Sequence, residues 1–168
     1  MASTYTPIAT YTTSNNTTTQ INFSSFSGYT DLVLVQALPN DPNGTYGYSN
    51  YRFNSDTGTN YSSTYGYNYN GVTAGRQANV AYLLNGTSSY MSNCLIITQI
   101  QNYSNTSTYK PILTRALFSA NSGGTVQEEW MSTGQWRSNS AITSIQVYTG
   151  ATGYSTGSTF TLYGILAA

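Results

Sequence analysis

Apolar and polar residues alternate along much of the chain with a period of two. In the segment Thr159–Tyr163, Phe160 and Leu162 fall on one face of an extended backbone, and threonines fall on the other. This pattern is typical of an antiparallel strand with one face in the core. Clusters of Gly, Asn, Ser and Pro separate such segments at intervals of about ten to fifteen residues.

Eleven segments carry the strand pattern, and no segment carries the apolar stripe and caps of a helix. The predicted strands are Tyr5–Thr13, Gln20–Phe26, Asp31–Ala37, Ser49–Phe53, Asn60–Tyr69, Gln77–Leu84, Asn93–Tyr103, Pro111–Ser119, Thr125–Arg137, Ala141–Tyr148 and Ser158–Ile165. Leu32–Val35 and Cys94–Ile97 are continuous apolar runs, which predicts that both faces of these two strands are buried. We therefore expect residues 1–168 to form one all-β domain, an antiparallel β-sandwich that is jelly-roll-like, with about ten strands.

Neutral polarity takes the place of charge in this sequence. It has five Lys plus Arg, five Asp plus Glu and no His, whereas Ser, Thr and Asn make up about two residues in five. Five scattered cations cannot form the basic stripe that neutralises a run of phosphates, so we expect no nucleic-acid partner. The 17 Tyr, 5 Phe and 2 Trp supply buriable surface, which favours a folded chain over a disordered one.

Most catalytic and metal chemistry is excluded by residue type. Without His, one chain cannot form a Ser-His-Asp or Cys-His arrangement, and with one Cys it cannot form a typical zinc site. Glu128 and Glu129 resemble a glycosidase pair, but successive strand residues point to opposite faces. We therefore expect no catalytic residue, no cofactor and no metal. Cys94, which lies in an apolar run, is expected in the core.

Two short acidic segments could supply oxygen ligands to calcium, but neither has the spacing of a known loop. Asp41 with Asn43 and Asn54 with Asp56 are therefore interpreted as turns. No apolar run approaches the ~18 residues of a membrane span, so no membrane partner is expected. The first residues lack the pattern of a signal peptide, and we expect synthesis in a cytoplasm without an export signal.

Tyrosine is the one positive functional signal. Tyrosines are rigid and amphipathic, and they build contact surfaces at low entropic cost. Their density in the middle of the chain predicts a subunit interface or a ligand platform, for which the candidates are Tyr46, Tyr48, Tyr51, Tyr65, Tyr67 and Tyr69, with Tyr61 beside them. Trp130 and Trp136 are assigned to the core or to an interface rather than to sugar stacking.

Four segments carry a resemblance to a known group. These are Tyr5–Thr12, Tyr29–Val35, Trp136–Ile145 and Gly157–Ile165. They resemble small virion structural proteins of tailed phages, especially marine and cyanobacterial phages. The resemblance implies a non-enzymatic capsid-decoration, knob or tail-fibre protein with a β-sandwich fold, located on the surface of the virion.

The first hypothesis is a decoration or cement protein on the outer head surface. It would be a homo-oligomer, a trimer, seated on the major capsid protein or another virion protein. The alternative is a receptor-binding module of a tail fibre or spike, with the tyrosines against a host surface glycan. Two further readings are a glycan hydrolase that uses Glu128 and Glu129, and an adhesin or amyloid subunit.

Overall fold

The computed structural model describes residues 4–39, 48–68, 71–88, 92–119, 127–150 and 152–166. Within these ranges the chain forms strands and turns, and no helix is long and apolar enough to cross a membrane. The strands are β1 (Tyr5–Thr12), β2 (Gln20–Ser24), β3 (Asp31–Leu38), β4 (Tyr48–Phe53), β5 (Tyr61–Asn68), β6 (Val72–Val80), β7 (Leu83–Ser88), β8 (Ser92–Ile100), β9 (Lys110–Ser119), β10 (Gln127–Trp136), β11 (Ser144–Thr149) and β12 (Thr159–Ile165).

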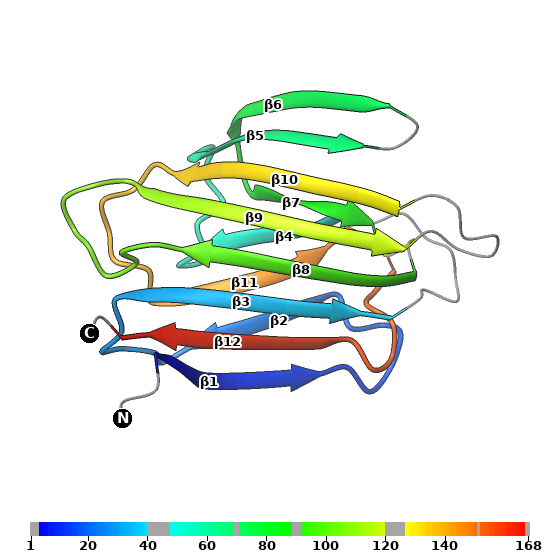
Figure 1. The fold of residues 1–168 in the computed structure, drawn as a ribbon. Helices are drawn as coiled ribbons and strands as arrows, with labels where there is room; N and C mark the ends of the chain where they lie inside the picture. Colours follow the sequence, from blue (N-terminus) through cyan, green and yellow to red (C-terminus); the bar gives the residue numbers. More distant parts are fainter. Residues whose placement is uncertain are drawn as a thin grey trace.

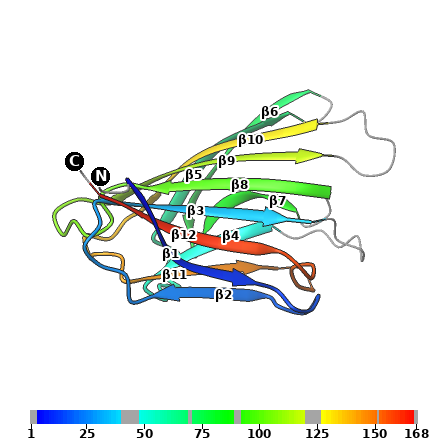
Figure 2. The same ribbon diagram turned by 60° about the horizontal axis from the view of Figure 1, so that its bottom comes forward.

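The strands form two antiparallel sheets packed face to face (Figure 1). The large sheet has the order β1-β12-β3-β8-β9-β10-β5-β6, and the small sheet has the order β2-β11-β4-β7. Figure 2 shows the two layers from another side, with the small sheet covering only part of the large one. The prediction of an all-β antiparallel sandwich is confirmed.

The pairing of the strands is that of a jelly roll with two added hairpins. β1 pairs with β12, β2 with β11, β3 with β8 and β4 with β7, all antiparallel. This nested pairing folds one long hairpin into two four-stranded sheets, as in a jelly roll. The hairpins β5–β6 and β9–β10 then lengthen the large sheet beyond β8. The described residues therefore contain twelve strands, against about ten expected.

One predicted strand is wrong. Gln77–Leu84 is two strands, because β6 ends at Val80, the chain bends at residues 81–82, and β7 begins at Leu83 in the other sheet. Asn79 in β6 has a φ of 56°, in the left-handed region that Asn tolerates better than most residues. The bend contains neither Gly nor Pro, so the sequence offers no common turn signal there.

Side chains that alternate along the strands fill the space between the sheets. Phe160 and Leu162 are fully buried, as their alternation predicts, and Cys94 lies in the core. The expectation for two apolar runs has a mixed outcome. In the run Leu32–Val35, Leu32–Leu34 are buried and Val35 is half-buried. Cys94–Ile97 is not buried on both faces, because Leu95 and Ile97 are 43% and 38% exposed. They point to the outer side of the large sheet.

A chain of hydrogen bonds between neutral side chains crosses the interior from one sheet to the other. Its members, here called the buried network, are Gln36, Ser49, Tyr51, Thr98, Thr114 and Tyr154, and each is at most 2% exposed. The hydroxyl of Tyr51 in β4 accepts a hydrogen bond from Gln36 Nε2 in β3 and lies 2.7 Å from Thr98 Oγ1 in β8. The network thus ties the small sheet to two strands of the large sheet.

Two further links extend the network. Ser49 Oγ donates to Gln36 Oε1 at 2.8 Å and lies 3.0 Å from the hydroxyl of Tyr154. Thr98 Oγ1 lies 3.0 Å from Thr114 Oγ1 of β9. Buried polar atoms are costly unless they are hydrogen-bonded, so these partners allow polar residues to occupy the core.

Tyr51→Phe is expected to lower the free energy of unfolding by about 1–3 kcal/mol, because it removes one hydrogen-bond partner from Gln36 and one from Thr98 inside the core. Urea denaturation followed by circular dichroism measures this change. Tyr11→Phe is the matched control, since Tyr11 is 43% exposed. Equal midpoints for the two variants would contradict the role given to the network.

Alkaline pH is expected to destabilise the fold. Burial raises the pKa of Tyr154 and of Tyr61 above the ordinary value of about 10. Both phenols then stay protonated in the folded state while they ionise in the unfolded chain, so their contribution is complete below about pH 10 and is lost as the pH rises further. Thermal melts should show a melting temperature that falls above pH 10, and less steeply for Tyr154→Phe. A Tyr154→Phe variant with the wild-type slope would refute this assignment.

Candidate functional site

The candidate tyrosines do not form one surface. Tyr46 and Tyr69 lie outside the described residues. Tyr51 and Tyr61 are fully buried, so the prediction that they belong to a contact surface is wrong. The Tyr51 hydroxyl is used by the buried network, and the Tyr61 hydroxyl accepts a hydrogen bond from the backbone N–H of Phe53 at 3.0 Å. Both tyrosines therefore hold the sheets together.

The three remaining candidates gather around a tryptophan and form an aromatic cluster of Tyr48, Tyr65, Tyr67 and Trp130. The ring of Trp130 stacks on Tyr65 with centroids 4.7 Å apart and on Tyr67 at 5.2 Å. Tyr48 approaches the same indole at 6.4 Å. Tyr48 is 48% exposed, whereas Trp130 is buried, as its assignment to the core or an interface allowed.

Strand register explains how the cluster forms. Tyr65 and Tyr67 are two residues apart on β5 and so share a face, and Trp130 of β10 lies directly opposite Tyr67. On the other side of β5, Gly75 of β6 lies opposite Tyr65. A Cβ at Gly75 would be 2.5 Å from Cζ of Tyr65. The missing side chain at this position lets the phenol lie flat over the neighbouring strand.

The outer face of the large sheet, which the small sheet does not cover, carries a second feature. Its side chains form two rows across six strands, named here the apolar strip: Ala37, Leu95, Leu117, Glu129, Asn68 and Val72 in one row, and Val35, Ile97, Arg115, Met131, Gly66 and Ala74 in the other. Val72, Met131 and Leu117 are 88%, 57% and 48% exposed. Sequence reasoning missed this strip, because its rows are assembled from strands far apart in the chain.

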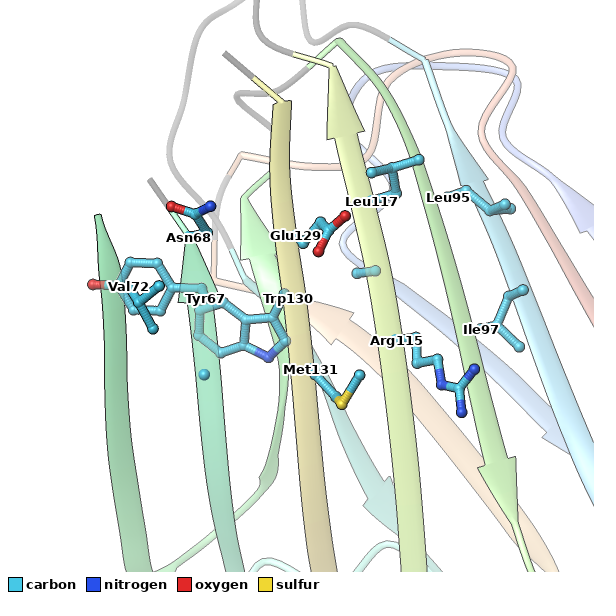
Figure 3. A pocket seen from close by; sticks show the side chains of 12 residues that line it. Tyr67, Asn68, Val72, Leu95, Ile97, Arg115, Leu117, Glu129, Trp130 and Met131 are labelled. Atoms are coloured by element: carbon cyan, nitrogen blue, oxygen red, sulfur yellow. The ribbon is translucent and has the colours of Figure 1, made fainter. Parts of the chain in front are cut away.

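The apolar strip is hollowed in its middle. Gly66 has no side chain between Met131 and Val72, and a shallow groove of about 570 Å³ opens there (Figure 3). Farther along the same face the side chains become polar, with Ser62, Thr64, Arg76, Thr133 and Gln135 around a smaller hollow. The face is therefore apolar at one end of the strands and polar at the other.

The carboxylate of Asp56 stabilises the turn in which it lies. Its carboxylate accepts hydrogen bonds from Trp136 Nε1 at 2.7 Å, Gly58 N at 2.8 Å and Asn60 Nδ2 at 3.0 Å. Burial opposes the ionisation of Asp56, but these hydrogen bonds outweigh it and lower the pKa. The side chain of Asn54 bonds across to residues 141–144. The turn interpretation of this pair is confirmed, while Asp41 and Asn43 lie outside the described residues.

The other chemically reactive side chains of the described ranges lie apart from one another. No group of three or more His, Cys, Asp and Glu side chains comes together there. Lys110 is buried, its Nζ donates to the carbonyl of Thr108 at 2.8 Å, and desolvation lowers its pKa. Glu129 is exposed on the apolar strip, and the side chain of Glu128 lies outside the described part of the chain.

Comparisons of the chain with protein-family models, with curated proteins and with solved structures find no match. The resemblance to virion proteins therefore stays a prediction from the sequence. The aromatic cluster and the apolar strip are the two candidate contact sites that the geometry supplies.

Gly75→Ala is expected to lower the free energy of unfolding by about 1–3 kcal/mol, because the new methyl group pushes the Tyr65 ring away from Trp130. Gly66→Ala is the matched control on the same hairpin, since its Cβ would meet only Thr73 O at an ordinary 3.7 Å. In a Tyr65→Ala background the cost of Gly75→Ala should largely disappear, which a double-mutant cycle by urea denaturation measures. Additive effects of the two substitutions would show that the ring and the glycine are not coupled.

Proposed function

We propose that this chain is a non-enzymatic structural protein of a tailed-phage virion, a decoration or cement protein bound to the outer surface of the head. The observation that carries the proposal is the outer face of the large sheet, a broad surface with few charges that is suited to contact with protein, either another virion protein or a second copy of this chain. The lineage in this proposal comes from the sequence resemblance, and the outer face is the surface that the proposal assigns to assembly.

The architecture is compatible with this role. Jelly rolls occur in viral capsid domains and in lectin domains, although a fold alone does not define a function. A metal-dependent enzyme on such a fold would need imidazoles or clustered carboxylates, and the sequence has no His at all. Contact with protein or with sugar is therefore the use of this fold that the residues favour.

The balance of charge also suits a particle in salt water. At ~1 M ionic strength the Debye length is ~3 Å, so attraction between exposed charges is strongly screened. A chain with five cations and five anions in 168 residues makes its contacts mainly through neutral groups. Such contacts persist when salt is high.

The aromatic cluster favours a second candidate, a receptor-binding module of a tail fibre or spike. Aromatic rings beside neutral hydrogen-bonding groups are suited to the apolar faces of sugar rings. Tyr48 is the half-exposed member of the cluster and would make the contact, while Tyr65 and Tyr67 pack against Trp130. This candidate places the protein at the tail.

Cryo-electron microscopy of the phage particle tests the first proposal. Density that fits the two sheets should appear on the outer surface of the head, repeated with the symmetry of the capsid. Density for this fold at the tail alone would contradict the decoration role and favour the second candidate. Its absence from the whole particle would contradict both.

A glycan array with purified protein tests the second candidate. If the aromatic cluster binds sugar, wild-type protein should bind and Tyr48→Ala should lose about tenfold or more in affinity, as expected for a central aromatic contact. Tyr11→Ala is the matched control, because Tyr11 is 43% exposed on the opposite edge strand β1. Equal loss in both variants, or no binding by wild type, would remove this candidate.

A further inference from the structure

The apolar strip holds most of the exposed aliphatic surface of the described chain. Six large aliphatic residues in the described ranges are exposed, and five of them, Val72, Leu95, Ile97, Leu117 and Met131, lie in the strip. Exposed apolar residues scattered singly need no explanation, but a contiguous patch marks an interaction site. The two rows cross six strands that lie ~4.8 Å apart, and together they cover about 400 Å² of the sheet. Apolar surface patches of this size are often functional.

The sequence of β8 points to the same conclusion. Its run Cys94–Ile97 has the continuous apolar pattern of a strand that is covered on both faces. The small sheet and the core cover one face, where Cys94 and Ile96 lie, and Leu95 and Ile97 remain open to solvent in the single chain. A second layer of protein over the outer face would give this strand the environment that its pattern predicts.

The two charges within the strip make it complementary to itself. Arg115 of β9 and Glu129 of β10 are diagonal neighbours, since Arg115 pairs with Met131 and Glu129 pairs with Leu117. Figure 3 shows the Arg115 guanidinium directed toward Ile97 of β8, away from the Glu129 carboxylate. One cation and one anion set in an apolar surface form a pattern that a second copy, turned by 180°, would match.

We propose that the apolar strip is the interface of a two-fold homodimer of this chain. The two-fold axis lies in the plane of the interface and bisects the line from Arg115 to Glu129. It brings each guanidinium against the carboxylate of the other copy. Because Leu117 and Met131 occupy the other two corners of the same rectangle of strand positions, they lie near the axis, and each meets its own counterpart.

The outer face sets an upper limit on the interface. Six strands from β3 to β6, about eight residues long at ~3.3 Å per residue and ~4.8 Å apart, cover about 760 Å² in all, of which the apolar strip around the axis is about 400 Å². A standard protein interface buries ~800 Å² on each partner. With the axis oblique to the strands, the two sheets cross roughly at right angles, which is one of the two common ways in which sheets pack.

A self-complementary patch favours two-fold symmetry over the trimer expected from the sequence. A closed ring of three copies needs two different patches on each chain that fit one another. The apolar strip instead carries the cation and the anion of the proposed contact on one surface. The proposed function rests on contacts of the same outer face, and this inference names the occupant of that face. A monomer in solution would overturn the dimer and leave the face free for another virion protein, whereas density on the particle tests the proposed function separately.

Sedimentation equilibrium of the purified chain is the first test. The expected mass is about 36 kDa, twice the 18.2 kDa of one chain. Arg115→Glu and Glu129→Arg should each raise the dissociation constant about tenfold or more, because like charges then face each other at two symmetric places. The double exchange Arg115→Glu/Glu129→Arg should restore dimerisation. A monomer at all concentrations, a trimeric mass, or a double exchange that stays dissociated would each overturn the proposal.

Chemical crosslinking locates the axis. Packed sheets lie ~10 Å apart, so a bis-maleimide with a spacer of roughly 10 Å should join two copies of Met131→Cys. Tyr109→Cys is the matched control, because Tyr109 is 47% exposed at the other end of β9. Native Cys94 is buried and should react slowly in both. Crosslinked dimer from Tyr109→Cys at the same yield, or none from Met131→Cys, would contradict the proposed geometry.

Discussion

The hydrogen bonds between Tyr51, Gln36 and Thr98 join the two sheets through the middle of the core. A chain with few charges and about two residues in five Ser, Thr or Asn cannot fill its interior with aliphatic residues alone. The polar side chains of the buried network lie in the core with neutral hydrogen-bond partners from both sheets. Each such bond adds about 1 kcal/mol, and each one left unpaired costs about 1–3 kcal/mol. The network therefore fixes which strands face each other.

The jelly roll places the rest of the molecule around this network. The four nested strand pairs surround it, and the hairpins β5–β6 and β9–β10 widen the large sheet beyond β8, where β7 of the small sheet packs against β5 and β10. The widened part contains the aromatic cluster on its inner face and most of the apolar strip on its outer face. Glycines make this packing possible, because Tyr65 lies over Gly75, Leu83 over Gly134 and Tyr29 over Gly164.

The local pattern of the sequence was enough to predict most strands, the burial of Cys94 and the turn at Asp56. It could not distinguish a buried tyrosine from an exposed one. The hydrogen-bond partners of Tyr51 come from β3 and β8, 15 and 47 residues away in the sequence. The residues next to Tyr51 therefore give no indication of these partners. For Leu95 and Ile97, the pattern predicted burial that the single chain does not supply. That disagreement is explained if a second copy of the chain covers the outer face.

The central claim is that neutral groups hold this protein together, inside and between copies. In the proposed dimer, Arg115 and Glu129 align the two copies, but exposed ion pairs contribute only ~0–1 kcal/mol, and the apolar strip supplies the main attraction. Sedimentation equilibrium in ~0.05 M and ~1 M sodium chloride tests the claim most directly. The account predicts a dimeric mass at both concentrations, with a dissociation constant that changes by no more than a few fold. Dissociation into monomers as the salt concentration rises would contradict it, because the contacts would then depend on charge.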